Sequence, residues 1–507
     1  MKTWGTGYHR CLLAMLLAGS TADASAPGLR AGFAAQEVTL PLMESWQDRN
    51  GNGLWDAGTD SYRDENGNGR FDTLWLAGYE PTRAARGKHD GIRAMAAAFD
   101  DGRQSLILAS IDAVGFSRDD VLDVRDRVRR ALGKEPGPGR ILIAATHTHG
   151  APDLLGLWGG EPGRSGVNDA YAREVIRRLT QVILQAWRQR QPARLAAGLV
   201  FPPGEADLQN DSRPPRIYDR GVRYLRVTGA GGKALGNLVF WSTHPETTGG
   251  ANLLVTADFP HYLRDGVRRG IRYDGQVKLE GLGGLTLYFT GAIGGLLSTN
   301  HDTKVHDPWL KKDFIQPGFA KARAEGYRLA AAVIRHYRAG KATVFRDTTL
   351  SVRDVVFDLT VSNPAFVAGI RAGIIRRRFH RDPVVRTEIS YTALGPLRLL
   401  GVPGEIYPEL VNGGVENPAG ADFAGAAAEL PPLRQLMGGS FAAVIGLADD
   451  ELGYILPRGQ WDEKPPWTYG LTRAPYGEVN SPGPETGPVI HRQAAALIRR
   501  VEKSLKR

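Results

Sequence analysis

The stretch "ILIAATHTHGAPD", residues 141–153, indicates both the kind of fold and the place of a functional site. Its apolar start predicts a buried strand, and it ends in two histidines followed by a glycine and a proline. Because side chains alternate along a strand, His147 and His149 are expected to point to the same side. Two interpretations are open for this pair alone: ordinary polar residues at a strand end, or half of a metal site.

The rest of the chain alternates between apolar runs typical of strands and amphipathic spacing typical of helices. Strands are predicted in residues 104–114, in residues 139–149 and, as a hairpin around a Gly-rich turn, in residues 223–244, and helices in residues 117–132, 171–190 and 321–340. This alternation predicts an α/β fold of layered mixed β-sheets flanked by helices. We expect a single large domain over residues 26–507.

Residues 1–25 are typical of a secretory signal peptide. Lys2 and Arg10 form a basic start, "CLLAMLLAG" is a short apolar core, and "ADASA" offers small residues for cleavage. We therefore expect export, to the periplasm or the medium. Cleavage would remove Cys11, the only cysteine, so any metal in the mature chain would be held by nitrogen and oxygen ligands.

The chain is basic, with a formal net charge of +10, and 42% of its residues are hydrophobic. The charge is consistent with attraction to anionic lipid or polymer surfaces, or with the arginine-rich composition of a high-GC genome. The basic residues are dispersed rather than interleaved with aromatic ones, which argues against nucleic-acid binding. The expected partner is a small-molecule or lipid substrate, with adsorption to a membrane surface left open.

A short internal repeat lies near the N-terminus, where "DRNGNGLWD" (48–56) recurs as "DENGNGRFD" (64–72). The pattern puts side-chain oxygens at alternate positions of a tight loop, as calcium requires. Thr59 and Trp75 stand where an EF-hand has its bidentate glutamate, so a full EF-hand is not expected. A pair of Asx turns is the alternative. The predicted structural calcium ligands are Asp48, Asn50, Asn52, Asp56, Asp64, Asn66, Asn68 and Asp72.

Three later segments have the same pattern as the opening stretch: a buried strand is followed by a turn with one side chain that can bind a metal. "NLVFWSTH" ends at His244, "RLLGVPGEIY" presents Glu405, and "AAVIGLADDELGY" reaches Tyr454. Each has an ordinary explanation when taken alone; Glu405, for example, suits a helix N-terminus. Together with His147 they favour a metal site at the ends of strands.

In this order, the motifs resemble the amidase domain of the neutral/alkaline (non-lysosomal) ceramidases. "AATHTHGAPD" is similar to the family's T-H-T-H-S-G-P, and "FWSTHPETTGGANLLVTADF" to W-F-x-V-H-x-T-S-x-x-x-x-N-x-L-I-S-G-D-N. "GVPGEIY" resembles V-P-G-E-F, "GLADDELGYILPRGQWD" resembles G-L-x-N-x-Y-x-x-Y-I-T-T-x-E-E-Y, and "APYGEVNSPGPETGP" resembles Q-x-Y-E-x-x-S-x-x-x-G-P. The similarity extends from about residue 32 to about residue 488.

The resemblance implies an enzyme that hydrolyses a linear amide, in ceramide or another N-acyl lipid, by a metal-activated water. It implies that His149 lies beside the metal and stabilises an oxyanion or shuttles a proton, and that Tyr476 helps to hold the tetrahedral intermediate. The metal it implies is zinc, with four ligands: His147, His244, Glu405 and Tyr454.

The chain also departs from the family pattern. Asp211 stands where the family has an active-site arginine, and Arg213, two residues further on, either reaches the same space or leaves the site differently charged. Ser298 aligns with the family's serine only across a gap. No C-terminal immunoglobulin-like domain is expected after "ETGP", and the calcium loops over 48–72 are an addition to the pattern.

Two alternatives therefore stay open. One is a zinc esterase, lactonase or deacetylase acting on a small or carbohydrate-linked substrate, which the change at Asp211 favours. The other is a non-catalytic, calcium-stabilised periplasmic binding or surface protein with a relic site. The intact set of four implied ligands argues against the second, because a relic site should lose its ligands first.

Overall fold

The computed structural model describes residue 1 and residues 28–39, 44–161, 163–299, 303–423, 425 and 428–506. The predicted signal peptide, with Lys2, Arg10 and Cys11, lies outside these residues except for Met1. Among the described helices, none is both long and apolar enough to cross a lipid bilayer.

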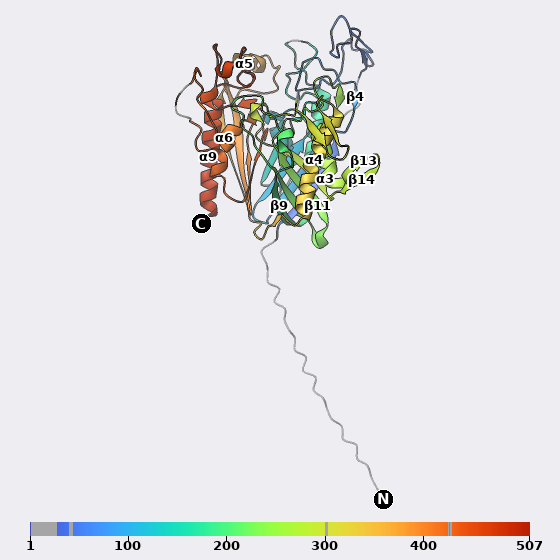
Figure 1. The fold of residues 1–507 in the computed structure, drawn as a ribbon, viewed down its shortest axis with the longest axis vertical. Coiled ribbons are helices and arrows are strands. Elements are labelled where there is room, and N and C mark those ends of the chain that lie inside the picture. Colours follow the sequence, from blue (N-terminus) through green and yellow to red (C-terminus); the bar gives the residue numbers. More distant parts are fainter. Residues whose placement is uncertain are drawn as a thin grey trace.

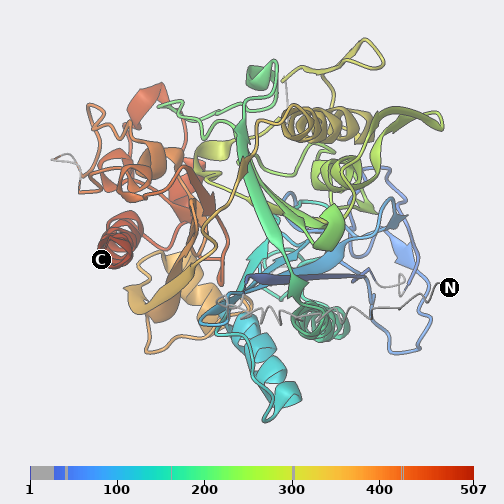
Figure 2. The same cartoon turned by 90° about the horizontal axis from the view of Figure 1, so that it is seen from below.

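Three larger β-sheets surround a common apolar core in the described part of the chain (Figures 1 and 2). The first has the order β7-β6-β5-β1-β8, with β1 at Arg30–Glu37, β5 at Arg93–Asp100, β6 at Ser105–Ile111, β7 at Arg140–Ala145 and β8 at Gln191–Pro192. The second has the order β15-β11-β10-β9-β18, with β9 at Arg194–Val200, β10 at Val222–Thr228, β11 at Ala234–Trp241, β15 at Leu285–Thr290 and β18 at Thr343–Val344. The third has the order β19-β20-β21-β23, with β19 at Leu350–Thr360, β20 at Val384–Leu394, β21 at Leu397–Gly401 and β23 at Phe441–Ile445.

Each of these sheets is mixed, with antiparallel pairs and one parallel pair that includes an edge strand. The parallel pairs are β6 with β7, β11 with β15, and β21 with β23. The carboxyl ends of two parallel strands lie at the same end of a sheet, where α/β proteins commonly place their functional side chains. All the implied metal ligands follow strands of these parallel pairs in sequence.

Helices cover the outer face of each sheet, while apolar residues such as Phe33, Leu225 and Leu399 fill the space between the inner faces. The helices α1 (Arg118–Leu132) and α2 (Asp169–Arg188) pack on the first sheet, α3 (Phe259–Arg269) and α4 (Phe319–Arg338) on the second, and α9 (Thr486–Leu505) on the third. The predicted fold class, layered mixed sheets flanked by helices, is therefore confirmed.

The remaining elements are short. The helices are α5 (Pro364–Arg371), α6 (Pro408–Asn412), α7 (Leu433–Leu436) and α8 (Tyr476–Val479). Two-stranded pairs are β2 (Trp46–Gln47) with β3 (Ser61–Tyr62), β4 (Gly87–Lys88) with β12 (Leu254–Val255), β13 (Gly270–Tyr273) with β14 (Gln276–Glu280), β16 (Val305–Asp307) with β17 (Lys312–Phe314), and β22 (Glu405–Ile406) with β24 (Tyr454–Ile455). Single 3-10 turns lie at Glu205–Asp207, Ala230–Gly232, Gly294–Leu296, Arg458–Gln460 and Thr468–Gly470.

The elements predicted from local patterns are present, with shifts at their ends. The largest is at the strand predicted over residues 139–149, since β7 ends at Ala145 and both histidines lie beyond it. The predicted hairpin is the antiparallel pair β10 and β11. Ser117 begins α1 as predicted, since its hydroxyl accepts a hydrogen bond from the Asp120 N–H. The helix α2 begins two residues earlier than predicted, because the Asn168 side chain accepts a hydrogen bond from the Tyr171 N–H and caps it there.

Candidate metal centre and its cavity

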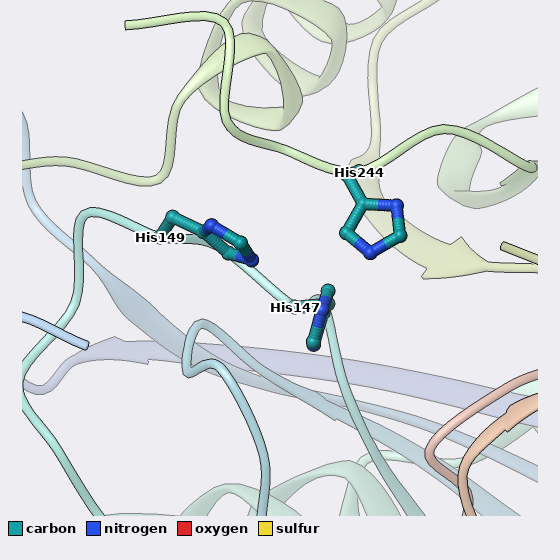
Figure 3. A group of neighbouring side chains, drawn as sticks. All are labelled: His147, His149 and His244. Carbon is teal, nitrogen blue, oxygen red and sulfur yellow. The ribbon is translucent and has the colours of Figure 1, made fainter. Parts of the chain in front are cut away.

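Three buried histidines converge on one space (Figure 3). His147 and His149 follow β7 of the first sheet, and His244 follows β11 of the second. One ring nitrogen from each lies within 4.8 Å of the other two. His147 has a positive φ of 68°, rare for a residue with a side chain, and its N–H donates to the Ala113 carbonyl. This group could hold a metal ion.

Glu405 and Tyr454 lie beside these histidines, on the short strands β22 and β24 that follow β21 and β23 of the third sheet. The strands β22 and β24 run parallel, with Glu405 directly opposite Tyr454. Glu405 Oε2 lies 2.9 Å from His244 Nε2 and 3.5 Å from His147 Nε2, and the Tyr454 hydroxyl lies 3.5 Å from His244 Nε2. Tetrahedral ligands of zinc stand about 3.4 Å from one another, since each is 2.0–2.1 Å from the ion. Two of the three separations match this spacing, and the 2.9 Å pair would have to open by about 0.5 Å to hold the ion.

The hydrogen bonds behind the two imidazoles favour the same interpretation. His147 Nδ1 lies 2.6 Å from the Val114 carbonyl, and His244 Nδ1 lies 2.9 Å from the Leu297 carbonyl. Because a carbonyl only accepts, each Nδ1 carries the proton, and a neutral ring then presents its Nε2 lone pair to Glu405. The Nε2 lone pair and the Glu405 carboxylate oxygen repel each other unless a cation, either a proton or a metal ion, lies between them. A backbone carbonyl behind the ring is also the usual outer partner of a metal-binding histidine.

The pKa values of the two imidazoles beside Glu405 are shifted in opposite directions. Burial lowers the pKa of His147 to about 4, against the attraction of Glu405. Burial also opposes charge on His244, but the shorter hydrogen bond that its protonated ring donates to Glu405 raises its pKa. Burial would raise the pKa of Glu405, yet the two histidines hold it below its usual value. An ionised carboxylate therefore lies between two imidazole nitrogens whose lone pairs can bind a metal. This arrangement is a favourable environment for a cation.

His149 is held differently. Its Nδ1 lies 3.3 Å from Glu246 Oε2, yet neither ring nitrogen has an aligned hydrogen bond within the described residues. The ring is packed from behind by Gly78, where φ is 97° and an added Cβ would lie 2.2 Å from the His149 ring. The Tyr79 ring contacts it edge-on, with centroids 5.1 Å apart. His149 thus lacks the outer carbonyl partner of the other two histidines and is positioned mainly by packing.

An apolar cavity of about 110 Å³ opens on this centre. His147, Glu405 and Tyr454 form part of its wall, and much of the rest is hydrophobic: Leu155, Trp158, Val361, Phe366, Ile370, Ile375, Val385 and Leu452. Glu451 also lines the cavity, and burial raises its pKa well above the usual value. Three of the four candidate ligands, His147, Glu405 and Tyr454, therefore share one enclosure with the hydrophobic surface.

Tyr476 is brought to the same cavity, at the start of α8. Its ring centroid lies 5.8 Å from that of Tyr454, and 55% of the residue is exposed. Tyr476 therefore stands where the cavity meets solvent, with its phenol next to the candidate ligands.

Arg213 is not among the residues that line the cavity. Its buried guanidinium donates to the Gln460 carbonyl at 3.1 Å and to Glu478 at 3.4 Å, and it lies 4.8 Å from the centroid of the Tyr407 ring. Tyr407 in turn packs against Tyr454, with centroids 6.1 Å apart. The Tyr407 ring therefore lies between Arg213 and the candidate ligand Tyr454.

Asp211 and Ser298, which also depart from the family pattern, make local backbone contacts. The Asp211 carboxylate accepts hydrogen bonds from the N–H groups of Arg213 and Ile217, both at 2.9 Å, and burial raises its pKa to about 7. Ser298 pairs with Asn210 through the backbone, next to the carbonyl that holds His244 Nδ1. Neither side chain lines the cavity.

The two Asp/Asn loops lie away from this centre and fold alike. Asp48 accepts hydrogen bonds from the N–H groups of Gly51 and Gly53 at 2.7 and 2.8 Å, and Asp64 accepts the equivalent pair in the second loop at the same distances. In each loop both asparagines donate amide hydrogens to the last aspartate. The predicted Asx turns are therefore present, and calcium remains a prediction.

Three residues of the site were not predicted from the sequence: Gly78, Glu246 and Glu451. Glu246 comes two residues after His244, where the family pattern has a threonine, and Glu451 comes three residues before Tyr454, where the pattern has a tyrosine. These two departures were the available signals. Gly78 approaches the site only because the chain folds back on itself.

No protein-family model matches the chain, and no curated protein matches it. Solved structures that are similar include the following two. Neutral ceramidase from Pseudomonas aeruginosa has a TM-score of 0.63 and 16% identity, over 94% of this chain and 75% of that one. A ceramidase complexed with C2 has a TM-score of 0.65 and 14% identity, over 94% of this chain and 76% of that one. The chain therefore has the fold of the neutral ceramidases, as its motifs predicted.

Proposed function

We propose that the protein is a zinc-dependent hydrolase that cleaves the amide bond of an N-acyl lipid, ceramide or a compound like it. One observation carries the proposal: His147, Glu405 and Tyr454 line the same cavity as a hydrophobic wall. Such an enclosure suits a substrate whose reacting carbonyl continues into a hydrocarbon chain. The similar structures are those of ceramidases, which supports the same chemistry.

In this proposal the zinc is held by His147, His244, Glu405 and Tyr454. A zinc ion at such a site lowers the pKa of a bound water and polarises the carbonyl. The cavity wall excludes bulk water and orients the acyl chain, which strengthens every polar contact with the reacting group.

Two further side chains handle charge and protons. In this proposal the Glu246 carboxylate accepts a hydrogen bond from the protonated Nδ1 of His149. The unprotonated Nε2 takes a proton from the attacking water and then, as an N–H, donates a hydrogen bond to the developing oxyanion. The Tyr476 hydroxyl, at the solvent edge of the cavity, donates a hydrogen bond to the same intermediate. Arg213 acts indirectly, by fixing the Tyr407 ring that packs against Tyr454.

Metal content measured together with amide hydrolysis tests the proposal. Purified wild type is expected to hold about one zinc per chain, and His147→Ala and Glu405→Ala to lose most of it, because each variant removes one of four ligands. Hydrolysis of N-acylsphingosine should fall by about 10³-fold or more in both. His306→Ala, at an exposed strand position, is the matched control and should keep both properties.

The same assay separates the alternatives. A matched pair of substrates with one acyl chain, joined as an amide or as an ester, shows which bond is preferred. Preference for the ester would favour the esterase alternative. Wild type that holds no zinc after reconstitution would overturn the hydrolase proposal.

Export is part of the proposal, and it rests on residues 1–25 alone. Protein purified from a periplasmic or culture fraction is expected to begin close to residue 26. N-terminal sequencing checks this, and an uncleaved chain confined to the cytoplasm would contradict it.

A further inference from the structure

A second cavity, a cleft of about 720 Å³, lies beside the Asp/Asn loops. One side is formed by residues of the 55–75 stretch and the other by residues 160–161 and 164–170. None of its lining residues lines the apolar cavity at the histidines. The cleft is therefore a separate concave surface, to which the proposed hydrolysis assigns no role. Of its lining residues, only Asp72 belongs to the predicted calcium ligands.

The cleft has an aromatic wall. Phe71 packs against Trp55, Tyr62 and Trp75, with centroids 4.3, 5.2 and 5.8 Å apart, and all four rings line the cleft. Trp75 is held in place by Gly160, where an added Cβ would lie 2.5 Å from its ring. Tyr62, Phe71 and Trp75 are only half buried, so parts of their rings remain open to a ligand.

The rest of the lining is rich in hydrogen-bonding groups of both kinds. Asp60 and Asp72 offer acceptors, Arg70 and Arg164 offer donors, and Asn168 offers an amide. Asp60, Asp72 and Arg70 lie on loops whose conformation is fixed by their own hydrogen bonds. Asp60, for example, accepts hydrogen bonds from the N–H groups of Arg49 and Asp56 at 2.9 and 2.8 Å. These groups are therefore in place before any ligand arrives.

This combination restricts the class of ligand. Acidic residues outnumber basic ones in the lining, which disfavours an anion, and the many polar groups disfavour an acyl chain. Aromatic faces attract the slightly positive C–H groups of a ring, while mixed donors and acceptors satisfy hydroxyl groups. We propose that this cleft binds a neutral saccharide, with one sugar ring against the Phe71–Trp75 wall and its hydroxyls bonded to the Arg70 and Asp72 side.

Titration of the full chain with soluble sugars tests the proposal. The probes are cellohexaose, chitohexaose and mannohexaose, and the readouts are calorimetric heat and tryptophan emission, since Trp55 and Trp75 line the cleft. We expect at least one probe to bind with a dissociation constant below about 1 mM. Absence of binding by all three, up to the solubility of each sugar, would overturn the proposal.

Variants then locate the bound sugar. Arg70→Ala and Trp75→Phe are expected to weaken binding about tenfold and about threefold, because the first removes hydrogen-bond donors and the second reduces the stacking surface. Arg63→Ala, an exposed arginine of the same insertion outside the cleft lining, should bind as the wild type does. Binding that survives Arg70→Ala and Trp75→Phe unchanged, or binding of choline in place of any sugar, would contradict a saccharide site here.

Discussion

The apolar cavity at the histidines and the polar cleft at the Asp/Asn loops are two concave regions built in opposite ways. The contacts of the first join distant parts of the chain: His244 and Glu405 are 161 residues apart. The hydrogen bonds within the first loop beside the second region join residues two to six positions apart. Chemistry at the histidines thus depends on how three sheets pack, whereas the loops depend on local turn formation.

This difference has a functional consequence. At the histidines, a small shift of one element moves a ligand or proton carrier while the local fold survives, so activity should be lost before stability. At the loops, a change first alters the local turn, so stability should respond before activity.

The largest difference is expected between two glycines with positive φ. Gly78→Ala should displace the His149 ring, because the new Cβ would lie 2.2 Å from it, and hydrolysis should fall about 100-fold with metal content retained. Gly69→Ala, at a φ of 73° with nothing within 4 Å of its Cβ, carries a similar backbone strain and should stay within about twofold in activity. Activity assays and metal analysis of both variants check this, and equal losses would contradict it.

A smaller effect is expected at the carboxylate next to His149. Glu246→Gln should lower kcat about tenfold and leave KM and metal content unchanged, because the amide orients His149 less strongly than the carboxylate does. Glu161→Gln, an exposed position that lines only the polar cleft, is the matched control. Steady-state kinetics decide, and an unchanged kcat would remove Glu246 from the mechanism.

The smallest effect on hydrolysis is expected from calcium. Calcium is predicted to raise Tm by a few degrees through binding to the folded loops only, and to leave kcat unchanged. Asp64→Ala should abolish part of this shift, whereas Asp101→Ala, in a half-buried turn outside the repeat, should keep all of it. Thermal melts with calcium and with a chelator measure the shift. A Tm indifferent to calcium would leave the loops as Asx turns alone.

Local pattern was sufficient for much of this molecule. Alternating apolar runs and amphipathic spacing predicted the elements around β6, β7, α1 and the β10–β11 hairpin, because both periodicities arise from the backbone itself. The repeated Asp and Asn register predicted the paired loops, since those hydrogen bonds stay within a few residues. The strand-then-ligand pattern also identified side chains that the structure brings together, from His147 to Tyr454.

What only the tertiary structure decided is how those segments meet. Arg213 lies behind Tyr407, although its place in the sequence suggested the active site, because buried Glu478 and the Tyr407 ring compensate its charge there. Gly78 and Glu246 take their roles from His149, and the aromatic wall of the cleft forms only when the insertion folds over. Such contacts depend on side-chain packing between sheets and loops, which no periodicity within one segment encodes.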